Sequence, residues 1–439
     1  MKRVLIITYY WPPSGGAGVQ RVLKFVKYLP EFGVRPVVLT VDPSHASYST
    51  LDDSLEADVP RDVRVVRTPS REPLRMLMAI AGRKAVPSGG FADSGKVGSM
   101  QRIMRWVRGN MLIPDARRGW VRYALQAAER IIEEEEIESV LISSPPHSAQ
   151  LIGLGLKERW PAMRLVVDLR DPWTDIFFVN ELFQGERAKR RNAAWEAQVV
   201  RKADAITVVG PSMKQSLAER YGAAVEAKTA VITNGFDRED LERIGTVPLA
   251  AERFRITYVG TMAHSYAPEV LFEAARCAMA TNTGLKLELR FVGGEFPQVR
   301  KLAEAAGMDV CCTWQGQVPH DEALREMAAA HMLLLVIPQG IGEERILTGK
   351  LFEYIGIGRP ILGIGPAHGD AAAVIVSCGA GRMFGRGEAA AMATWIAEQA
   401  NLGMTLDTSI GRDGRMQYER RTLAGRMAAI LVPEGAGNA

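Results

Sequence analysis

The sequence predicts an α/β protein made of two doubly wound domains, each a parallel sheet with helices on both faces. Short Val- and Ile-rich runs alternate with helical patterns along all 439 residues, which is typical of strands buried on both faces. The chain is also too long for one compact core. The alternation is interrupted at 237–254. We therefore expect a first domain at 1–245, a second at 246–410, and a final helix with a short tail at 411–439.

In the first domain, seven apolar runs are expected to be strands. They are 3–8, 35–41, 63–68, 139–144, 164–170, 205–210 and 230–235. Helical periodicity predicts helices at 18–32, 118–135, 147–158, 187–202 and 211–221. Ligands of such folds bind where the loops leave the carboxyl ends of the strands.

The second domain repeats the pattern. Its expected strands are 255–261, 286–293, 311–316, 332–338, 360–365 and 381–385. Its expected helices are 267–279, 296–306, 320–330, 349–357 and 388–400, and a last helix follows at 414–432. Two such domains in tandem are expected to face each other across a cleft that both sets of strand ends line.

Composition excludes several classes of protein. An apolar fraction of 47% and a charged fraction of 24% are ordinary for a globular protein, and a net charge of +4 is too small to indicate nucleic-acid binding. The four cysteines lack metal-ligand spacing, so neither a metal nor another cofactor is expected. No apolar run approaches the length of a membrane span. We expect a cytoplasmic protein.

One segment is strongly basic. Residues 71–125 contain eleven Lys or Arg against three acids. Within this segment, Arg102, Arg105 and Arg108 recur at helical spacing, while apolar residues occupy the other faces of a helix predicted at 100–111. Such a helix can lie peripherally on anionic lipid. It can equally be a solvated helix that packs on its own domain.

The loop after the first strand, YYWPPSGGAGVQR, is rich in glycine. Gly15, Gly16 and Gly18 follow a strand and open a helix, so backbone N–H groups there can approach an anion or a sugar. A dinucleotide fingerprint needs a further glycine where this chain has Arg21. The loop therefore predicts ligand contact without nicotinamide binding.

Two later loops of the first domain carry polar residues. His147 opens a helix after two prolines, and it is either a packing residue or a polar contact to a sugar or its acceptor. The stretch DLRDPW places Arg170 between Asp168 and Asp171. The three residues form either an internal ion-pair set or a site in which Asp171 contacts acceptor hydroxyls.

The second domain opens with the strand-loop YVGTMAHSY. Backbone N–H groups near Gly260 and the hydroxyl of Thr261 can hold phosphate oxygens. Just before this domain, ITNGFD reads as an Asn-Gly turn that includes Asp237.

The stretch LTGKLFEYIGIGRPIL carries the strongest functional pattern. A helix beginning near Thr348 or Gly349 presents N–H dipoles, a hydroxyl and the Lys350 cation to one anion. Glu353 follows Lys350 at helical spacing and can accept hydrogen bonds from the two hydroxyls of a ribose. The alternative is a surface ion pair between Lys350 and Glu353.

These stretches together resemble glycosyltransferase family 4, in particular its members in bacterial polysaccharide and cell-envelope assembly. The resemblance rests on YYWPPSGGAGVQR, VVDLRDPW, VITNGFD, YVGT and, above all, GKLFEYIGIGRPIL. It implies the GT-B fold and a retaining, metal-independent transfer from a nucleotide-sugar to a lipid-linked or saccharide acceptor. It also implies that the acceptor binds to the N-terminal domain, and that the final helix packs back on that domain.

The chain departs from the family pattern at two points. Many members have two glutamates eight residues apart, but Arg345 stands eight before Glu353. Many also have an Arg and a Lys near the loop after YVG, and this loop has neither. The resemblance then implies that Lys350, Arg345 and backbone amides hold the diphosphate.

Two other functions remain open at this stage. A sugar-nucleotide epimerase or hydrolase would need an acid/base pair, for which the candidates are His147, His264, Asp168 and Asp171. A non-catalytic protein that binds sugar nucleotides or lipid would need none.

Overall fold

The protein is described by a computed structural model. The described residues are 1–48, 50–72, 99–175, 183–262, 266–294, 296–402 and 412–433. They divide into two compact units. Unit 1 includes the described chain up to Thr233 and again from Arg420, and unit 2 runs from Asn234 to Glu419.

Unit 1 contains a seven-stranded parallel sheet in the order β3-β2-β1-β4-β5-β6-β7. The strands are β1 Lys2–Thr8, β2 Val34–Val41, β3 Arg64–Thr68, β4 Ser139–Ser144, β5 Arg164–Leu169, β6 Ala205–Val208 and β7 Thr229–Val231. All seven predicted strands are confirmed. The order reverses between β1 and β4, which is where folds of this type bind ligands at the carboxyl edge.

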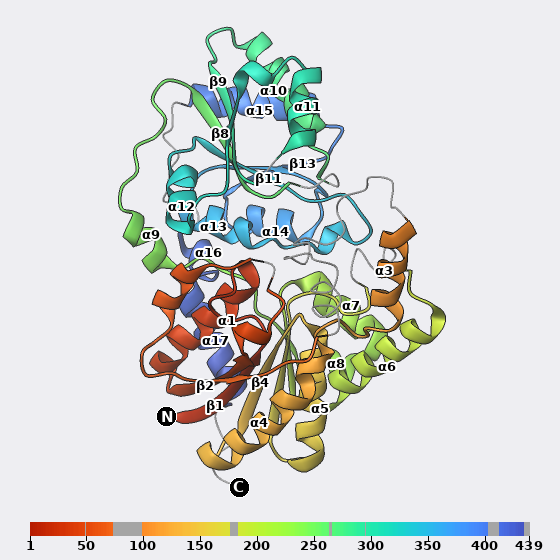
Figure 1. The fold of residues 1–439 in the computed structure, drawn as a ribbon. Coiled ribbons are helices and arrows are strands. Elements are labelled where there is room, and N and C mark those ends of the chain that lie inside the picture. The colour runs from red at the N-terminus through yellow and green to blue at the C-terminus, as the bar shows by residue number, and fades with distance from the viewer. Residues whose placement is uncertain are drawn as a thin grey trace. The chain divides into compact units, whose positions relative to one another are not determined.

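Helices cover both faces of this sheet (Figure 1). The helices of unit 1 are α1 Ala17–Tyr28, α3 Ser99–Asn110, α4 Val121–Glu135, α5 Gln150–Arg159, α6 Glu186–Lys202, α7 Pro211–Tyr221, α8 Ala223–Ala227 and α17 Arg420–Leu431, of which α3 contacts α6. Short 3-10 turns at Leu29–Phe32, Pro43–His45, Asp53–Asp58, Arg118–Trp120 and His147–Ala149 complete the unit.

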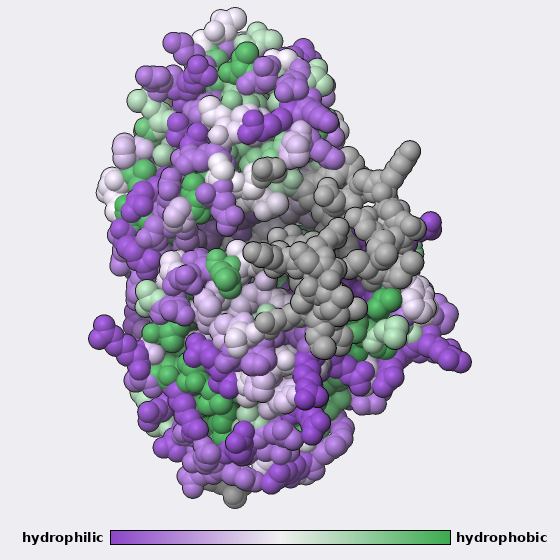
Figure 2. Space-filling model, viewed as in Figure 1, coloured by the Kyte–Doolittle hydropathy of each residue, from purple (hydrophilic) through white to green (hydrophobic). Residues whose placement is uncertain are grey.

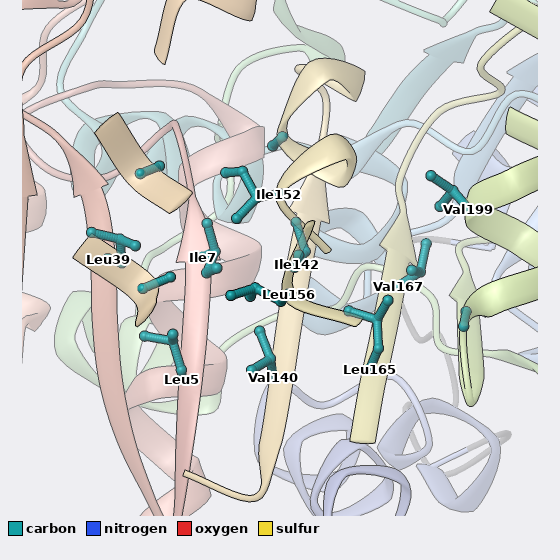
Figure 3. Packing of buried hydrophobic residues seen from close by; sticks show 14 of the residues in the cluster. Leu5, Ile7, Leu39, Val140, Ile142, Ile152, Leu156, Leu165, Val167 and Val199 are labelled. Carbon is teal, nitrogen blue, oxygen red and sulfur yellow. The ribbon is translucent and has the colours of Figure 1, made fainter. Parts of the chain in front are cut away.

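The core of unit 1 follows from the alternation of side chains along its strands. Ile7, Ile142 and Val167 point to one face and pack with residues of α5 such as Ile152 and Leu156 (Figure 3). The opposite face packs against α1 and α17. Because both faces are covered, the central strands are mostly apolar and show no strict alternation of apolar and polar residues.

Unit 2 contains a six-stranded parallel sheet in the order β10-β9-β8-β11-β12-β13. The strands are β8 Phe254–Gly260, β9 Leu287–Gly293, β10 Cys312–Gln315, β11 Met332–Val336, β12 Ile361–Ile364 and β13 Gly381–Phe384, as predicted. The helices are α9 Arg238–Ile244, α10 Glu269–Thr281, α11 Pro297–Ala305, α12 His320–Ala328, α13 Gly349–Ile357, α14 Asp370–Ser377, α15 Ala389–Asn401 and α16 Arg412–Met416, with 3-10 turns at Asp309–Cys311 and Glu343–Arg345. One face packs against α10 and α15, the other against α12, α13 and α14.

Two helices of unit 2 were not predicted. The first, α9, lies inside the stretch interpreted as irregular, and Asp237 caps it by accepting a hydrogen bond from the backbone N–H of Glu239 at 3.0 Å. The expected Asn-Gly turn at Asp237 is therefore corrected to a helix cap. The second, α14, is short and rich in Val and Ile, residues that favour strands. Burial of Ala371 and Ile375 against the sheet stabilises it as a helix instead.

The final helix is not continuous as predicted for 414–432. The chain forms α16, turns at residues 417–419, and then forms α17 in unit 1. At the turn, the backbone N–H of Phe236 donates to the carbonyl of Tyr418 at 3.1 Å, which pairs the two crossing segments of the chain. Thereafter α17 packs on α1.

Candidate functional site

A buried ion pair lies at the carboxyl edge of the unit 1 sheet. Arg21 of α1 donates through Nε and NH2 to the two carboxylate oxygens of Asp168, at 3.1 and 2.7 Å. Both side chains are fully buried. The same guanidinium donates to the carbonyls of Ile232 and Thr233, at 2.9 and 2.7 Å.

Asp168 has a complete set of donors. The hydroxyls of Ser143 and Thr207 each donate to it at 2.7 Å, in addition to Arg21. Burial by itself would raise the pKa of Asp168, but Arg21 and these hydroxyls hold the pKa below its ordinary value. Asp168 is therefore a structural carboxylate, and its place among the acid/base candidates is corrected. The arginine that interrupts the glycine fingerprint is its partner.

The glycine-rich loop makes room for a second arginine. A Cβ atom at Gly18 would lie 2.4 Å from NH1 of Arg170, and Arg170 itself donates to the carbonyls of Ser144 and Pro145. Gly16 caps α1 with a φ of 96°, a conformation that favours glycine. Gly15 donates its N–H to the carbonyl of Thr50 at 2.9 Å. At least part of this glycine pattern thus serves packing.

His147 is a buried polar residue on the turn after β4. Within the described residues, neither Nδ1 nor Nε2 has a hydrogen-bond partner. Its ring stacks on Trp173 with centroids 5.2 Å apart and planes 9° apart. Burial lowers the pKa of His147, which favours the neutral imidazole with one donor and one acceptor nitrogen. Such a ring can bond a hydroxyl that no residue described here supplies.

Two acids act on His147 from neighbouring loops. Asp115 accepts hydrogen bonds from the backbone N–H and the hydroxyl of Ser148, at 2.7 and 2.8 Å, and so fixes the turn that carries the imidazole. Asp171 follows β5 and is exposed. Burial lowers the pKa of His147, whereas the negative charges of Asp115 and Asp171 raise it. The structure therefore brings His147 and Asp171, predicted separately, into one electrostatic neighbourhood.

In unit 2, Lys350 lies in the first turn of α13. Its Nζ donates to the phenol oxygen of Tyr258 at 2.7 Å and lies 4.1 Å from the centroid of that ring. Tyr258 is fully buried on β8. Burial lowers the pKa of Lys350 to about 7, although the charge of Glu353 acts to raise it. Near neutral pH the ammonium is thus poised between its two forms.

The phenol of Tyr258 forms a second hydrogen bond. Tyr258 donates its O–H to the carbonyl of Thr261 at 2.7 Å. Burial raises the pKa of Tyr258 well above its usual value, so the phenol stays protonated and can accept from Lys350 while donating to Thr261. The backbone of the predicted phosphate loop is thereby connected to the predicted cation, while the Thr261 side chain is exposed.

Two glycines, which lack a side chain, leave space for the Lys350 side chain. Gly260 ends β8 with a φ of 121°, and a Cβ there would lie 2.9 Å from Nζ of Lys350. Gly293 ends the neighbouring β9 with a φ of 137°, and its Cβ would lie 2.3 Å from the carbonyl oxygen of Gly260. Both positions require glycine by conformation and by space. The first glycine is the one predicted at the site, and the second was missed.

A second tyrosine fixes α13 on the sheet. The hydroxyl of Tyr354, which is fully buried, accepts the backbone N–H of Val259 at 3.1 Å. Tyr354 and Lys350 are four residues apart and therefore share a face of α13. In the sequence, Tyr354 stands out only as part of the motif GKLFEYIGIGRPIL. Its spacing from Lys350 was the available signal.

The start of α13 carries an unpartnered hydroxyl. Thr348 is the N-cap residue, but its side chain caps no backbone N–H. Its Oγ1 is buried and, among the described residues, has no hydrogen-bond partner. Buried polar atoms are normally bonded. This hydroxyl lies next to Gly349 at the helix N-terminus.

The remaining predicted donor residues lie nearby in the chain. Glu353 is half-buried one turn after Lys350. Arg345 ends a 3-10 turn and lies 3.4 Å from the carboxylate of Glu344. A cation that was not predicted, Arg386, follows β13, forms an ion pair with Glu343 at 2.9 Å and donates to a backbone carbonyl.

Two further predictions concern His264 and the absence of a metal ion. His264 lies outside the described residues. In the part of the chain that the structure describes, no three His, Cys, Asp or Glu side chains are grouped so as to hold a metal ion.

A family model matches part of the chain. Residues 87–240 match Glycosyltransferase Family 4. The matched stretch lies almost wholly in unit 1 and contains His147 and Asp171, but it ends before Lys350 and Glu353. No curated protein matches the chain.

Solved structures are similar over nearly the whole chain. A glycosyltransferase from Rickettsia africae ESF-5 has a TM-score of 0.61 at 12% identity, covering 99% of both chains. WaaG, a glycosyltransferase involved in lipopolysaccharide biosynthesis, has a TM-score of 0.56 at 13% identity, covering 98% of this chain and 100% of its own. A TarM mutant from S. aureus, solved with fondaparinux, alpha-GlcNAc-glycerol and UDP, has a TM-score of 0.59 at 10% identity, covering 98% and 100%.

These likenesses confirm the predicted fold class. The chain has the GT-B fold, two Rossmann-like domains with parallel sheets. The family match and the fold together support a transferase.

Proposed function

We propose that this protein is a retaining, metal-independent glycosyltransferase of family 4 that moves a sugar from a nucleotide-sugar to a lipid-linked or saccharide acceptor. The observation that carries the proposal is the start of α13. There a partly buried lysine, a buried hydroxyl that has no partner among the described residues, and a helix N-terminus come together beside a glycine-lined strand end. These are the groups that a diphosphate requires.

Unit 2 would bind the donor. The diphosphate would accept hydrogen bonds from Lys350, from Thr348 and from the first N–H groups of α13, while Glu353 would accept bonds from the ribose hydroxyls. Arg345 is a second cation for the same anion. Because an anion favours the charged form of Lys350, donor binding would convert the lysine fully to ammonium.

The chemical step would be carried by electrostatic stabilisation. The bond from the anomeric carbon to the phosphate oxygen breaks, and the acceptor hydroxyl forms the new bond on the same face of the sugar. The acceptor proton passes to the leaving phosphate oxygen, so no protein base is needed. Lys350 would stabilise the charge that develops on the leaving diphosphate.

Unit 1 would bind the acceptor. The neutral His147 offers one donor and one acceptor nitrogen to a hydroxyl, and stacking on Trp173 fixes its plane. Asp171 is exposed at the adjacent strand end and would contact a further hydroxyl. The packing role of Gly18 leaves Gly15 and Gly16 as the loop positions proposed to approach the ligand.

The biological setting is proposed from the resemblance and from the similar structures. WaaG is named for lipopolysaccharide biosynthesis, and the sequence motifs resemble bacterial polysaccharide assembly enzymes. We therefore place the reaction in cell-surface polysaccharide synthesis, on the cytoplasmic side of the membrane.

Thermal stabilisation by UDP-, GDP-, ADP- and dTDP-sugars tests the donor assignment. We expect one nucleotide to raise the melting temperature selectively, and Glu353→Ala to remove most of that shift without unfolding the protein. Lys301→Met, an exposed change in the same unit, serves as a control. An unchanged shift in Glu353→Ala would contradict the ribose assignment.

The non-catalytic alternative predicts a different combination of results. Tight nucleotide binding without sugar transfer to any lipid or saccharide fraction would support a binding protein. An epimerase or hydrolase would consume the nucleotide-sugar without an acceptor. Product analysis with and without acceptor separates the three functions.

A further inference from the structure

We propose that Arg170 binds a phosphate group carried by the saccharide acceptor. Arg170 directly follows β5 in unit 1 and contacts the end of β4 and the first turn of α1. The inference rests on the proposed function and deepens it, because it names the chemical class of the acceptor, a phosphorylated sugar. The phosphate belongs either to a free sugar phosphate or to the diphosphate of a lipid-linked sugar.

Arg170 is a cation without a carboxylate partner. It stands between Asp168 and Asp171 in the sequence, but Asp168 pairs with Arg21. In the part of the chain that the structure describes, no acid forms an ion pair with Arg170. Burial lowers the pKa of Arg170, whereas the charges of Asp171 and Asp168 raise it, and a guanidinium remains protonated in proteins. Its positive charge is therefore not matched by a bonded carboxylate.

The guanidinium of Arg170 keeps one nitrogen for a ligand. Nε donates to the carbonyl of Ser144 at 3.2 Å, and NH2 donates to the carbonyl of Pro145 at 2.7 Å. NH1 has no hydrogen-bond partner among the described residues and is accessible to solvent. Two neutral oxygens thus hold the guanidinium in place without neutralising it, and NH1 is left to donate to an anion.

NH1 of Arg170 lies beside the first turn of α1. A Cβ atom at Gly18 would be 2.4 Å from it. The N-cap residue Gly16 provides no side-chain cap for this helix of 12 residues, and the first N–H groups of a helix favour an anion. A phosphate has enough acceptor oxygens to bond both the guanidinium and these N–H groups, whereas a carboxylate has two. The arrangement therefore favours a phosphate.

Groups that bind hydroxyls adjoin this cation. His147 is 8% exposed, and neither ring nitrogen has a partner among the described residues. It begins the turn that follows Ser144 and Pro145, the two residues whose carbonyls Arg170 contacts. Asp171 is the next residue after Arg170 and is exposed. A ligand that fits both the cation and the hydroxyl-binding groups is a sugar that carries a phosphate.

Calorimetric titration with glucose 1-phosphate, inorganic phosphate and glucose tests the proposal. The parent chain is the full-length Lys350→Met variant, so that the proposed donor site in unit 2 contributes little binding. We expect both phosphate compounds to bind, and Arg170→Met to weaken them by about 10- to 100-fold. Glucose, which lacks the phosphate, should bind weakly and with no dependence on Arg170.

Gly18→Ala tests the same site without removing the charge. The added Cβ crowds NH1 of Arg170, so this variant should also weaken both phosphate compounds. Alanine favours a helix more than glycine does, so the variant should keep its folding stability. Loss of stability in Arg170→Met with unchanged phosphate binding in both variants would make Arg170 a structural residue and overturn the proposal.

Arg61→Met is the matched control, because it removes an exposed arginine elsewhere in unit 1. Hydrophilic residues are spread widely over the face of the molecule that Figure 2 shows, so an exposed arginine by itself does not indicate a site. The control should bind phosphate compounds like its parent. Equal loss in Arg61→Met and Arg170→Met, or no phosphate binding by the parent, would overturn the proposal. Tighter binding of glucuronate than of glucose 1-phosphate would also overturn it.

A glucose linked through diphosphate to a short prenyl chain separates the two sources of the phosphate. If it binds through Arg170 more tightly than glucose 1-phosphate does, the acceptor is a lipid-linked sugar. Equal binding of the two compounds identifies a free sugar phosphate.

Failure of this proposal differs from failure of the proposed function. If the natural chain binds a nucleotide-sugar but phosphate binding does not depend on Arg170, only the phosphate site is wrong. If glucose 1-phosphate binds through Arg170 but no nucleotide-sugar binds, the phosphate site stands without the enzymatic role. If Arg170→Met weakens nucleotide-sugar binding and leaves glucose 1-phosphate binding unchanged, the guanidinium belongs to the donor diphosphate and the proposal is overturned.

Discussion

Two cations lie near strand ends, one in each unit, and their partners differ. Arg21 meets the two oxygens of Asp168 and two backbone carbonyls, all buried. Lys350 instead donates to a neutral phenol and lies over its ring. A cation matched by a carboxylate holds the fold together, whereas a lysine held by a neutral partner can take up full charge when an anion binds. The kind of partner, more than the residue type, distinguishes a structural cation from a cation in a binding site.

Arg21→Met should produce the largest effect on stability. Removing one member of a buried ion pair leaves Asp168 charged and unmatched, which should cost about 3–5 kcal/mol of unfolding free energy. Urea denaturation of the variant measures this loss. Arg21→Met combined with Asp168→Leu should cost less than the single change. A single variant as stable as the natural chain would show that the pair is not structural.

In contrast to Arg21→Met, Lys350→Met should weaken donor binding and leave folding stability intact. It should weaken nucleotide-sugar binding by about 1.5–3 kcal/mol, or roughly 10- to 150-fold, because a charge-assisted bond to the diphosphate is lost. Stability should stay unchanged or rise, since a desolvated cation is removed. Calorimetric titration and urea denaturation together give both quantities. Weaker folding with unchanged binding would make Lys350 a structural residue like Arg21.

The pH dependence of donor binding is a second test of the difference between Lys350 and Arg21. Free Lys350, with its pKa lowered from 10.5 to about 7, is neutral above that pH, whereas an anion binds the charged form. Donor affinity should therefore fall by up to about tenfold per pH unit above pH 7. Lys350→Met should remove this dependence, and a flat profile in the natural protein would contradict the assignment.

The lowered pKa of Lys350 also determines the direction in which folding stability changes with pH. Between about pH 7 and the ordinary lysine value of 10.5, the unfolded chain binds more protons at Lys350 than the folded protein does. The contribution of this residue to stability should therefore rise with pH across that window. Comparing urea midpoints of the natural protein and Lys350→Met at pH 7 and pH 9 isolates it.

Thr348→Val should give the smallest effect. The hydroxyl has no partner among the described residues, so replacing it by a methyl group should leave stability unchanged or slightly raised. Donor binding should weaken by about 0.5–1.5 kcal/mol, roughly two- to tenfold. Thr394→Val, on α15 and away from this loop, is the control. Loss of stability with unchanged binding would show that the hydroxyl caps α13.

The sequence by itself determined the two sheets and the position of the lysine helix. Strands buried on both faces are mostly apolar, and helices between them repeat an apolar stripe, so both are visible as local patterns. The helix at Gly349–Ile357 was predicted with the bounds that the structure shows. Local capping and packing explain the misses: Asp237 starts a short helix, and α14 contains the run Val374, Ile375 and Val376, residues that favour strands.

Only the tertiary structure decided what each polar residue contacts. Arg21 and Asp168 are separated by 147 residues, and Lys350 and Tyr258 by 92. No local pattern indicates which of these cations is neutralised, because hydrogen-bond partners are chosen by strand order and helix packing rather than by spacing along the chain. Burial, which withdraws water from Lys350 and His147 and shifts their pKa values, is likewise a property of the folded chain alone.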